Sequence, residues 1–479
     1  MKFLHFTLAG CFLLTGFSCL AQPAAKPNVV IIYIDDLGYG DLSCYGNTQV
    51  KTTNIDWLAE QGTRFTSFYV NSPVCSPSRV AMMTGQYPAR HRIYTYLDSR
   101  AKNRENNMPD YLPATVPTLA KSMKANGYAT AHYGKWHLGG GRDVDDAPLP
   151  TAYGFDRSFT SFEGLGDRTL HLDDNLNKAS AKLGQGKIIE AKQHQQTGIY
   201  VDSALAFIQR NGSRPFFLHL FPNDVHDPYN PDGGWEEFAG ITDNKDQQKF
   251  LATLKAMDMQ LGRFINELRR LGKLENTLIL LTSDNGPTDW PYYYKNGGTP
   301  PCSAGDFRGR KWSLYEGGIR EPFIAFWPAR IPKGKIDSTT VMSVVDILPT
   351  VCKLTGGSLP SSGEFDGYDR SGNLLGKAIK TTNDIFWYYP NKPLPGNKEN
   401  ISPVLAIRSG DWKFLMEEDG SNQQLYNIKT DHREQTNMLQ KASTTAVHLY
   451  KKLKDWQRKV LQDGRKEEGG RRLEHGEVR

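Results

Sequence analysis

The sequence predicts an α/β fold in which a mostly parallel central sheet is flanked by helices, followed by a smaller C-terminal α+β domain. Three observations predict it: short apolar runs that lack polar alternation, helical patterns between these runs, and a change of texture after residue 376. Unbroken apolar runs are typical of strands buried on both faces. Their alternation with helices indicates parallel strands joined by crossover connections.

The expected strands are short and end in polar residues. Residues 28–35 read NVVIIYID, which is apolar from Val29 to Ile34. A run of this length without alternation is expected of a strand in the middle of a covered sheet. Similar runs predict further strands at residues 128–136, 215–222 and 277–286. Amphipathic patterns predict helices at residues 117–127, 200–210 and 250–272.

Composition divides the chain into four parts. We expect a signal peptide over 1–21, a main domain over 22–376, an α+β domain over 377–465 and a flexible tail over 466–479. Residues 404–428 read as short antiparallel strands around glycine turns. The apolar residues of 447–460 follow helical spacing, whereas the tail is strongly polar.

The first residues have the pattern of a secretory signal. Lys2 precedes an apolar stretch over residues 3–17, and Cys19 begins a small-residue cleavage site. This predicts a secreted or periplasmic protein, with lipid attachment at Cys19 as the alternative. No later apolar run is long enough to span a bilayer, so no membrane span is expected.

Cysteine content and charge set further limits. Cys11 and Cys19 would leave with the signal peptide, so four cysteines remain: Cys44, Cys75, Cys302 and Cys352. If Cys75 is used for chemistry, the other three can form at most one disulfide, and the sequence does not say which. The net charge of +6 is modest and compatible with an anionic substrate. Nucleic acid is not expected as a partner, because no nucleic-acid-binding motif is present.

Polar residues recur where the expected strands end. Because ligands bind at the carboxyl ends of strands in open α/β sheets, these residues are candidates for one site. Each motif alone also fits an ordinary turn or surface loop. Their joint occurrence favours a site, and the residues are Asp35, Asp36, Lys135, His137, His226, Asp284 and Asn285.

These residue types point to metal-assisted hydrolysis of an oxyanion ester. Carboxylate and amide oxygens are hard ligands that suit Ca²⁺ or Mg²⁺ better than zinc. Arg79, Lys135 and Lys311 supply positive charge for a tetrahedral oxyanion, and an expected helix start at residues 76–79 adds backbone donors. His137 and His226 can move protons near neutral pH.

The segment NSPVCSPSRVAMMTG, residues 71–85, carries the strongest motif. We expect a helix to begin here, with Pro77 in its first turn. Residues 75–79 match the Cys-x-Pro-x-Arg signature of the type I sulfatases of the alkaline phosphatase superfamily, which the chain resembles over about residues 27–440. Further similar motifs occur in the family's order: DDLGYGD at 35–41, GKWHLG at 134–139, His226-Asp227-Pro228, Asp284-Asn285-Gly286, Lys311 before EGGIR at 316–320, SGDWKF at 409–414 and LYNIKTD at 425–431.

The resemblance implies a sulfuric ester hydrolase with a modified cysteine. A formylglycine-generating maturation enzyme would oxidise Cys75 to an aldehyde, which hydrates to a gem-diol. One hydroxyl would attack sulfur, and the other would lose its proton and expel sulfate, which restores the aldehyde. The domain over 22–376 would then be the catalytic domain.

The resemblance also implies a role for each candidate residue. One Ca²⁺ per chain would be held by Asp35, Asp36, Asp284 and Asn285 together with the modified Cys75. Asp284 would act as base, and Arg79 would hold the gem-diol. Lys135 and Lys311 would bind sulfate oxygens, His226 would bind substrate and protonate the leaving alcohol, and His137 would assist sulfate release.

We expect the substrate to be a sulfated carbohydrate. Trp290 and residues 292–294 supply aromatic rings that can stack on sugars or simply pack their loop. Residues 318–328, GIREPFIAFWP, look like those of family members acting on galactose or N-acetylgalactosamine sulfates, although Glu321 stands where many members have valine. Specificity is expected in the loops 92–111, 163–195 and 288–308. The sulfate position, exo or endo action and oligomeric state are left open.

Two alternative functions remain. The first is a phosphonate monoester hydrolase or phosphodiesterase, because such enzymes share the superfamily fold. The second is an inactive glycan-binding protein on the same scaffold. Competing rates on aryl sulfate and aryl phosphate diesters separate the first alternative from a sulfatase.

Overall fold

The computed structural model describes residues 25–163, 168–172, 187–294, 298–360, 364–390 and 397–474. The predicted signal peptide over 1–21, with Cys11 and Cys19, lies outside the described residues. Among the described residues, no helix is both long and apolar enough to cross a membrane.

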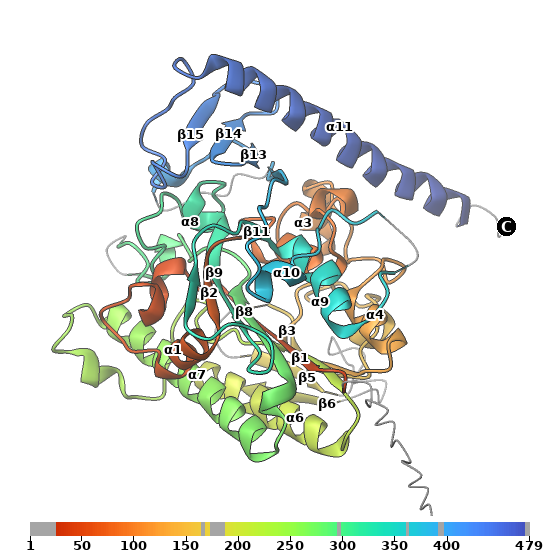
Figure 1. Cartoon of the computed structure of the whole chain (residues 1–479), viewed down its shortest axis with the longest axis vertical. Coiled ribbons are helices and arrows are strands. Elements are labelled where there is room, and N and C mark those ends of the chain that lie inside the picture. Colours follow the sequence, from red (N-terminus) through yellow and green to blue (C-terminus); the bar gives the residue numbers. More distant parts are fainter. Residues whose placement is uncertain are drawn as a thin grey trace, which may run out of the picture.

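One large sheet forms the centre of the molecule (Figure 1). Eleven strands of the described chain belong to it, and most neighbouring pairs are parallel. The exceptions involve β9, which is antiparallel to both its neighbours, and β5. The strand order is β10 (Lys335–Asp337), β2 (Thr63–Tyr69), β9 (Arg320–Phe326), β8 (Thr277–Ser283), β1 (Asn28–Ile34), β7 (Phe216–Phe221), β3 (Ala129–Lys135), β4 (Arg157–Ser161), β5 (Arg168–Leu172) and β6 (Lys187–Ala191), with β11 (Met342–Ser343) paired to β2.

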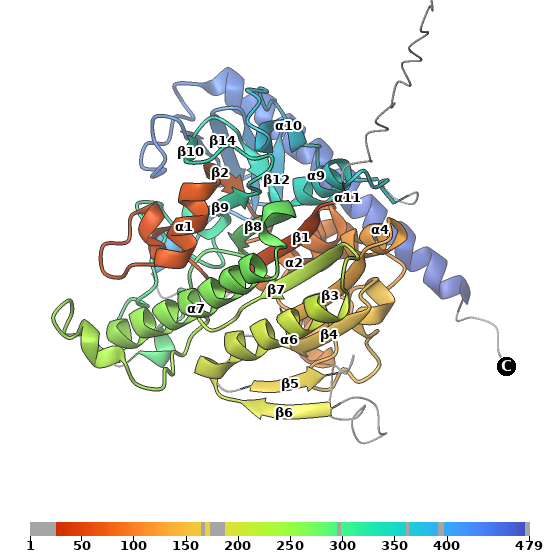
Figure 2. The same ribbon diagram turned by 60° about the horizontal axis from the view of Figure 1, so that its bottom comes forward.

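Helices cover both faces of this sheet. Burial on both faces explains why the sequence of β1 is apolar throughout. Val29 and Ile31 belong to the core on one face of the sheet, and Val30 and Ile32 belong to the core on the other. One face is covered by α1 (Thr53–Gln61), α6 (Gln196–Arg210) and α7 (Lys245–Arg270), as Figure 2 shows. The other carries α2 (Cys75–Thr84), α4 (Leu119–Ala125) and α9 (Ile347–Thr355). Shorter helices are α3 (Arg100–Glu105), α8 (Glu316–Ile319) and α10 (Ser371–Leu374).

A second, antiparallel sheet forms the C-terminal part (Figure 1). Its four strands lie in sequence order, and α11 (Ser443–Glu474) packs against it. The strands are β12 (Ile385–Tyr388), β13 (Leu405–Ser409), β14 (Trp412–Met416) and β15 (Gln424–Asn427). The predicted fold class is therefore confirmed, whereas the exact domain boundary at residue 376 stays a prediction.

Buried charges join the two parts. Lys413 Nζ of β14 lies 3.0 Å from Glu316 Oε1 and 2.9 Å from Glu434 Oε1, and all three side chains are fully buried. The backbone N–H of Glu316 donates to Glu434 Oε2 at 2.7 Å. Arg320 and the Tyr69 hydroxyl donate to Glu316 Oε2 at 3.2 and 2.7 Å. We call Glu316, Lys413 and Glu434 the interface cluster.

Two further expectations can be compared with the structure. Cys44, Cys75, Cys302 and Cys352 are all free thiols, so the disulfide left open by the sequence is not formed. Helix α11 continues through Glu474, so the segment expected as a tail from residue 466 is helical up to that point. Residues 475–479 lie outside the described chain.

Candidate active site

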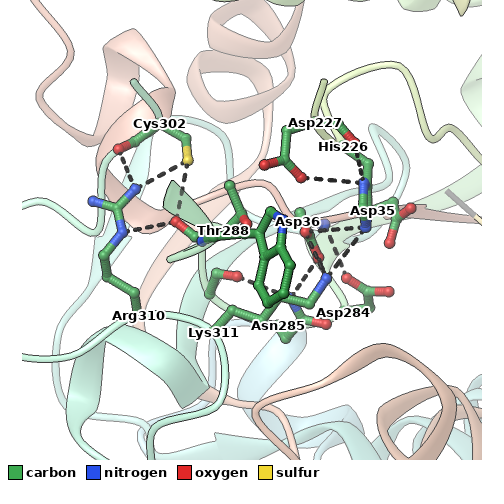
Figure 3. A network of polar contacts seen from close by, with 12 residues as sticks. Asp35, Asp36, His226, Asp227, Asp284, Asn285, Thr288, Cys302, Arg310 and Lys311 are labelled. Carbon is green, nitrogen blue, oxygen red and sulfur yellow. Dashed lines mark hydrogen bonds and ion pairs between the residues drawn. The ribbon is translucent and has the colours of Figure 1, made fainter. Parts of the chain in front are cut away.

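The predicted site residues from four strand ends meet at the carboxyl edge of the large sheet. Asp35 and Asp36 follow β1, Lys135 ends β3, His226 lies in the loop after β7, and Asp284 follows β8. These four strands are consecutive in the sheet order β8-β1-β7-β3, which brings residues far apart in sequence side by side. Figure 3 shows the side chains of Asp35, Asp36, His226, Asp284, Asn285 and Lys311 gathered in one place.

Asp35 forms a fully buried ion pair with Lys135. The ammonium donates to both carboxylate oxygens at 2.7 and 2.8 Å. Burial acts to raise the pKa of Asp35, but Lys135, with help from His226 and Arg79, outweighs it and holds the pKa well below the ordinary value. Asp35 is therefore an anionic carboxylate at neutral pH.

Asp36 forms a second buried ion pair, with Lys311. Lys311 Nζ donates to both oxygens of Asp36 at 2.7 Å and lies 3.3 Å from His226 Nε2. Asp36 has a φ of 57°, a left-handed conformation that aspartate tolerates better than most residues. We call Asp35, Lys135, Asp36 and Lys311 the floor cluster, because both lysines line the pocket described below.

His226 contacts the floor cluster through one ring nitrogen. Its Nδ1 lies 2.8 Å from the carbonyl oxygen of Asp227, so Nδ1–H donates and Nε2 is left as an acceptor facing Lys311. Burial lowers the pKa of His226 to about 4, although Asp36 acts against it. The imidazole of the ligand-free protein is therefore neutral at pH 7.

Cys75 is the first residue of α2, as the sequence predicted. Its side chain lines the pocket, yet the residue is only 2% exposed. Burial raises the pKa of the thiol to about 12, even though Lys135 and Lys311 act to lower it. Because the thiolate is the reactive form of cysteine, an unmodified thiol with this pKa is a poor nucleophile.

Arg79 ties α2 to the strand ends. Its Nη2 and Nε donate to Asp284 Oδ2 at 2.7 and 3.1 Å, and its Nη1 donates to the carbonyl oxygen of Lys135 at 2.8 Å. The guanidinium also lies over the rings of Tyr33 and Phe221, 5.7 and 5.5 Å from their centroids. These contacts fix the first turn of α2, and with it Cys75, against the sheet edge.

Asp284 and Asn285 complete a set of oxygen donors. Asp284 Oδ1 accepts the backbone N–H of Asp36 at 3.0 Å, and Asn285 Nδ2 donates to Asp36 Oδ1 at 2.7 Å. Burial raises the pKa of Asp284 to about 7, although Arg79 acts against it. Asn285 Oδ1 is buried and has no hydrogen-bond partner within the described residues.

This donor set fits a hard cation such as Ca²⁺. The unpartnered amide oxygen of Asn285 and the carboxylates around it are the ligand types such cations prefer. Potential ligand atoms of Asp35, Asp36, Cys75 and His226 all lie within 4.8 Å of one another. The role expected for His226, proton donation to the leaving group, stays a prediction, and its ring lies close to these carboxylates.

His137 approaches the pocket from the loop after β3. Its Nε2 contacts the carbonyl oxygen of Leu97 at 3.1 Å, and its buried Nδ1 lacks a hydrogen-bond partner among the described residues. Burial, together with Lys135, lowers the pKa of His137 well below its ordinary value. A neutral ring with a free nitrogen beside the pocket is suited to contact a ligand.

A pocket of about 190 Å³ opens above these groups. Cys75, Lys135, His137, His226 and Lys311 all line it. The three loops expected to determine specificity each contribute: residues 92–111 supply Tyr96 and Asp98, residues 163–195 supply Glu163, and residues 288–308 supply Thr288, Trp290 and Tyr293. Residues 164–167, 173–186 and 295–297 of these loops lie outside the described chain.

Several residues that line the pocket were not predicted from the sequence. Arg142 follows a run of three glycines, 139–141, which begins with the last residue of GKWHLG, and this glycine run next to a predicted site motif was a usable signal. Asp227 was quoted only as part of a motif. It lines the pocket, accepts a hydrogen bond from the Tyr294 hydroxyl at 3.2 Å, and has a pKa that burial raises to about 7.

Comparison with known proteins decides the family. A family model described as Sulfatase matches residues 27–358, more than half of the chain. The chain belongs to the sulfatase family. A second model, described as N-sulphoglucosamine sulphohydrolase, C-terminal, matches residues 307–460. The protein is thus a sulfatase, a hydrolase of sulfate esters, as the resemblance predicted.

Individual relatives support the same assignment. Arylsulfatase A of Homo sapiens is 34% identical over 420 residues, covering 83% of this chain and 76% of that protein. N-acetylgalactosamine-6-O-sulfatase of Bacteroides thetaiotaomicron is 30% identical over 510 residues, covering 90% and 94%. The crystal structure of Ps i-CgsB in complex with k-i-k-neocarrahexaose is 26% identical, with a TM-score of 0.73 over 90% of this chain and 93% of that one.

Proposed function

We propose that this sulfatase releases sulfate from a sulfated carbohydrate, using a formylglycine made from Cys75 and one Ca²⁺. The observation that carries the proposal is the position of Cys75. It lies at the start of α2, beside two buried lysine–carboxylate pairs, at the floor of a pocket. The signal predicted over 1–21 makes a secreted or periplasmic location part of the same proposal.

The pKa of Cys75 favours a modified residue over a thiolate nucleophile. A pKa of about 12 leaves almost no thiolate at neutral pH. An aldehyde hydrate at this position offers a hydroxyl for attack and a second hydroxyl whose deprotonation can release the sulfate. Asp284, which accepts hydrogen bonds from Arg79, is proposed as the base, and Arg79 as the residue that holds the hydrate in place.

Asp35, Asp36, Asp284 and Asn285 would hold the Ca²⁺, together with the oxygen of residue 75. When bound, the cation supplies positive charge that lowers the pKa of the attacking hydroxyl and offsets the charge of the ester. Lys311 and Lys135 already balance two of the carboxylates. The four ligands therefore keep a donor set suited to one divalent ion.

The remaining pocket residues would bind and activate the ester. Lys135 and Lys311 present ammonium groups to sulfate oxygens, and His226 lies beside Lys311 where the leaving oxygen would be protonated. A bound anionic ester favours the protonated imidazole, which is the form that can donate a proton. His137, with its unpartnered Nδ1, is proposed to assist the release of sulfate.

Two facts support a carbohydrate substrate. A relative from Bacteroides thetaiotaomicron is named an N-acetylgalactosamine-6-O-sulfatase, and a similar structure was solved with a neocarrahexaose. In this chain the pocket wall contains Trp290, Tyr293 and Trp312, and aromatic rings of this kind pack on the apolar faces of sugars. Galactose or N-acetylgalactosamine sulfates are the proposed class.

Two measurements test the proposal. Mass spectrometry of the peptide that contains residue 75 should show oxygen in place of H₂S in active protein. Sulfate release from sulfated galactosides and glycosaminoglycan oligosaccharides should exceed release from a simple aryl sulfate in kcat/KM. Full activity with an unmodified Cys75 would disprove the nucleophile. A preference for steroid sulfate, choline sulfate or an aryl phosphate diester would disprove the substrate.

A further inference from the structure

An ion-paired arginine lies in the pocket wall, apart from the floor cluster. Arg142 Nε lies 3.0 Å from Asp98 Oδ1, and Arg142 Nη2 lies 2.9 Å from Glu163 Oε2. The Arg142 side chain is 42% exposed, and all three residues line the pocket. Partly exposed ion pairs add little to stability, roughly 0–1 kcal/mol, so stability alone does not account for this arrangement.

The backbone around Arg142 is strained into position. Arg142 has a φ of 53°, in the left-handed region that an arginine rarely adopts. Gly141 precedes it, and a Cβ at Gly141 would lie 2.1 Å from the ring of Phe162. Strained residues of this kind persist where the surrounding structure fixes them, often at ligand-binding positions.

Asp98 is held just as firmly. Its N–H donates to Asn103 Oδ1 at 2.9 Å, and Asn103 Nδ2 donates back to the Asp98 carbonyl at 3.1 Å. Asp98 Oδ1 also accepts the backbone N–H of Ser99 at 2.6 Å. The preceding residue, Leu97, contacts His137 of the proposed catalytic set, so this part of the wall is rigidly joined to the floor of the pocket.

The atoms left over complement a sugar hydroxyl. Within the described residues, Arg142 Nη1 and Asp98 Oδ2 make no hydrogen bond, and they offer a donor and an acceptor. A hydroxyl both donates and accepts, so one hydroxyl or two neighbouring ones can satisfy them together. Trp290 and Trp312, with ring centroids 6.0 Å apart, supply an apolar part of the same wall.

The charges of the wall argue against a second anion. A lone arginine would attract a carboxylate or sulfate, because its guanidinium binds such groups with two parallel hydrogen bonds. Here two carboxylates flank the single guanidinium, so Asp98, Arg142 and Glu163 carry a net charge of −1 by residue type. A second sulfate or a uronic carboxylate next to them would be repelled.

We infer that Asp98, Arg142 and Glu163 form a subsite for the hydroxyls of a neutral sugar ring that carries a single sulfate, and that this subsite excludes sugars with a second anionic group. The pocket of about 190 Å³ is small beside the roughly 300–1,000 Å³ of drug-sized ligand sites, which suits one ring. The inference rests on the proposed carbohydrate substrate and adds to it the charge of the ring.

The test compares sugars that differ by one sulfate. Wild-type protein is assayed on N-acetylgalactosamine 4-sulfate, the 6-sulfate and the 4,6-disulfate, with 4-nitrophenyl sulfate as a reference. We expect kcat/KM on the better monosulfate to exceed that on the disulfate by about tenfold or more, because like charges repel in a partly buried site. The Asp98→Asn and Glu163→Gln double variant leaves Arg142 without a counter-charge, so this preference should fall by about tenfold.

Arg142→Gln tests the hydroxyl contact separately. We expect the ratio of kcat/KM on the monosulfated sugar to that on 4-nitrophenyl sulfate to fall by about tenfold, because only the sugar loses a hydrogen bond. Arg142→Lys should restore part of this ratio. Matched controls on the exposed surface of α6, Asp202→Asn and Arg210→Gln, should behave as wild type.

The outcomes separate this inference from the proposed function. If the disulfate is turned over as well as the better monosulfate, the inference alone is overturned. The same holds if the double variant keeps the preference of the wild type for the monosulfate. Turnover of 4-nitrophenyl sulfate with no turnover of any of the sugars overturns the carbohydrate proposal and the inference together. Circular dichroism of each variant confirms that it has folded.

Discussion

The floor cluster and the interface cluster both consist of buried lysine–carboxylate ion pairs, but only the floor cluster lies in the candidate active site. Each joins buried lysine to buried carboxylates at distances of 2.7–3.0 Å. In the interface cluster the carboxylate oxygens of Glu316 and of Glu434 each lie in a hydrogen bond or an ion pair, and Glu434 Oε1 has only its ion pair with Lys413. Beside the floor cluster, Asn285 Oδ1 and His137 Nδ1 lack partners among the described residues, and a pocket opens above. Buried charge alone therefore does not distinguish the two clusters, whereas buried atoms with neither a hydrogen bond nor an ion pair, next to a pocket, do.

The largest expected effect separates Cys75 from the protein's other thiols. Cys75→Ala should fold and lose activity by about 10⁴-fold or more, because removing a nucleophile abolishes nearly all covalent catalysis. Cys352→Ala is the matched control, since Cys352 is also buried and free but lies in α9. Sulfate release per folded molecule measures both. A Cys75→Ala protein with substantial activity would contradict the mechanism.

Removing a carboxylate from the floor cluster should remove the metal. Asp36→Ala should lower bound Ca²⁺ to near zero and turnover by about 10²–10³-fold. The reason is that the site loses one of its anionic ligands and then binds the cation less tightly. Metal analysis of purified protein and kcat measure this. Glu434→Gln in the interface cluster should keep its metal. Zinc bound by nitrogen and sulfur in the wild-type protein would refute the assignment.

The interface cluster should respond in stability. Lys413→Met leaves Glu316 and Glu434 buried without their shared cation, so the free energy of unfolding should fall by about 3–5 kcal/mol. Urea denaturation measures this loss, and kcat of the remaining folded protein should stay close to wild type. Lys311→Met also leaves a buried carboxylate, Asp36, without its cation, but in addition it should cause a large loss of turnover. Equal losses of turnover in both variants would remove the distinction between the clusters.

The smallest expected effect concerns pH. Burial raises the pKa of Glu434 from 4.5 to about 7, although Lys413 acts against it. The folded protein therefore binds this proton more tightly than the unfolded chain, and the contribution to stability is present below pH 4.5 and lost as pH rises to about 7. Other buried acids act similarly, so the test is the difference between wild type and Glu434→Gln. That difference should change by about 1–3 kcal/mol over this range, and a constant difference would contradict the assignment.

Much of the fold could be predicted because burial leaves a direct trace in sequence. The strand at residues 28–34 is apolar throughout since helices cover both of its faces. The antiparallel strand β9 could not be predicted in the same way. Its neighbours β2 and β8 are more than 200 residues apart in the chain, and pairing of that kind depends on the whole sheet.

The candidate site, like the fold, could be predicted only in part. Its residue types could be predicted, because motifs at strand ends converge in a parallel sheet. The pairing of Lys135 with Asp35 and of Lys311 with Asp36 could not, since loop conformation selects each partner. Arg142 was missed because its contacts with Asp98 and Glu163 join three separate loops, whose packing no local pattern records.

Because Cys75 is buried, any enzyme that modifies it must act before α2 packs against the sheet. All ten residues of α2 are buried, and Cys75 itself is 2% exposed, so a second protein cannot reach the thiol once the helix has packed. Modification and folding then compete in time, and the faster one decides the fate of each chain. A chain that folds before modification would be correctly folded and stable, but permanently inactive. The active fraction of a preparation would therefore depend on the relative rates of modification and folding, and not on an equilibrium.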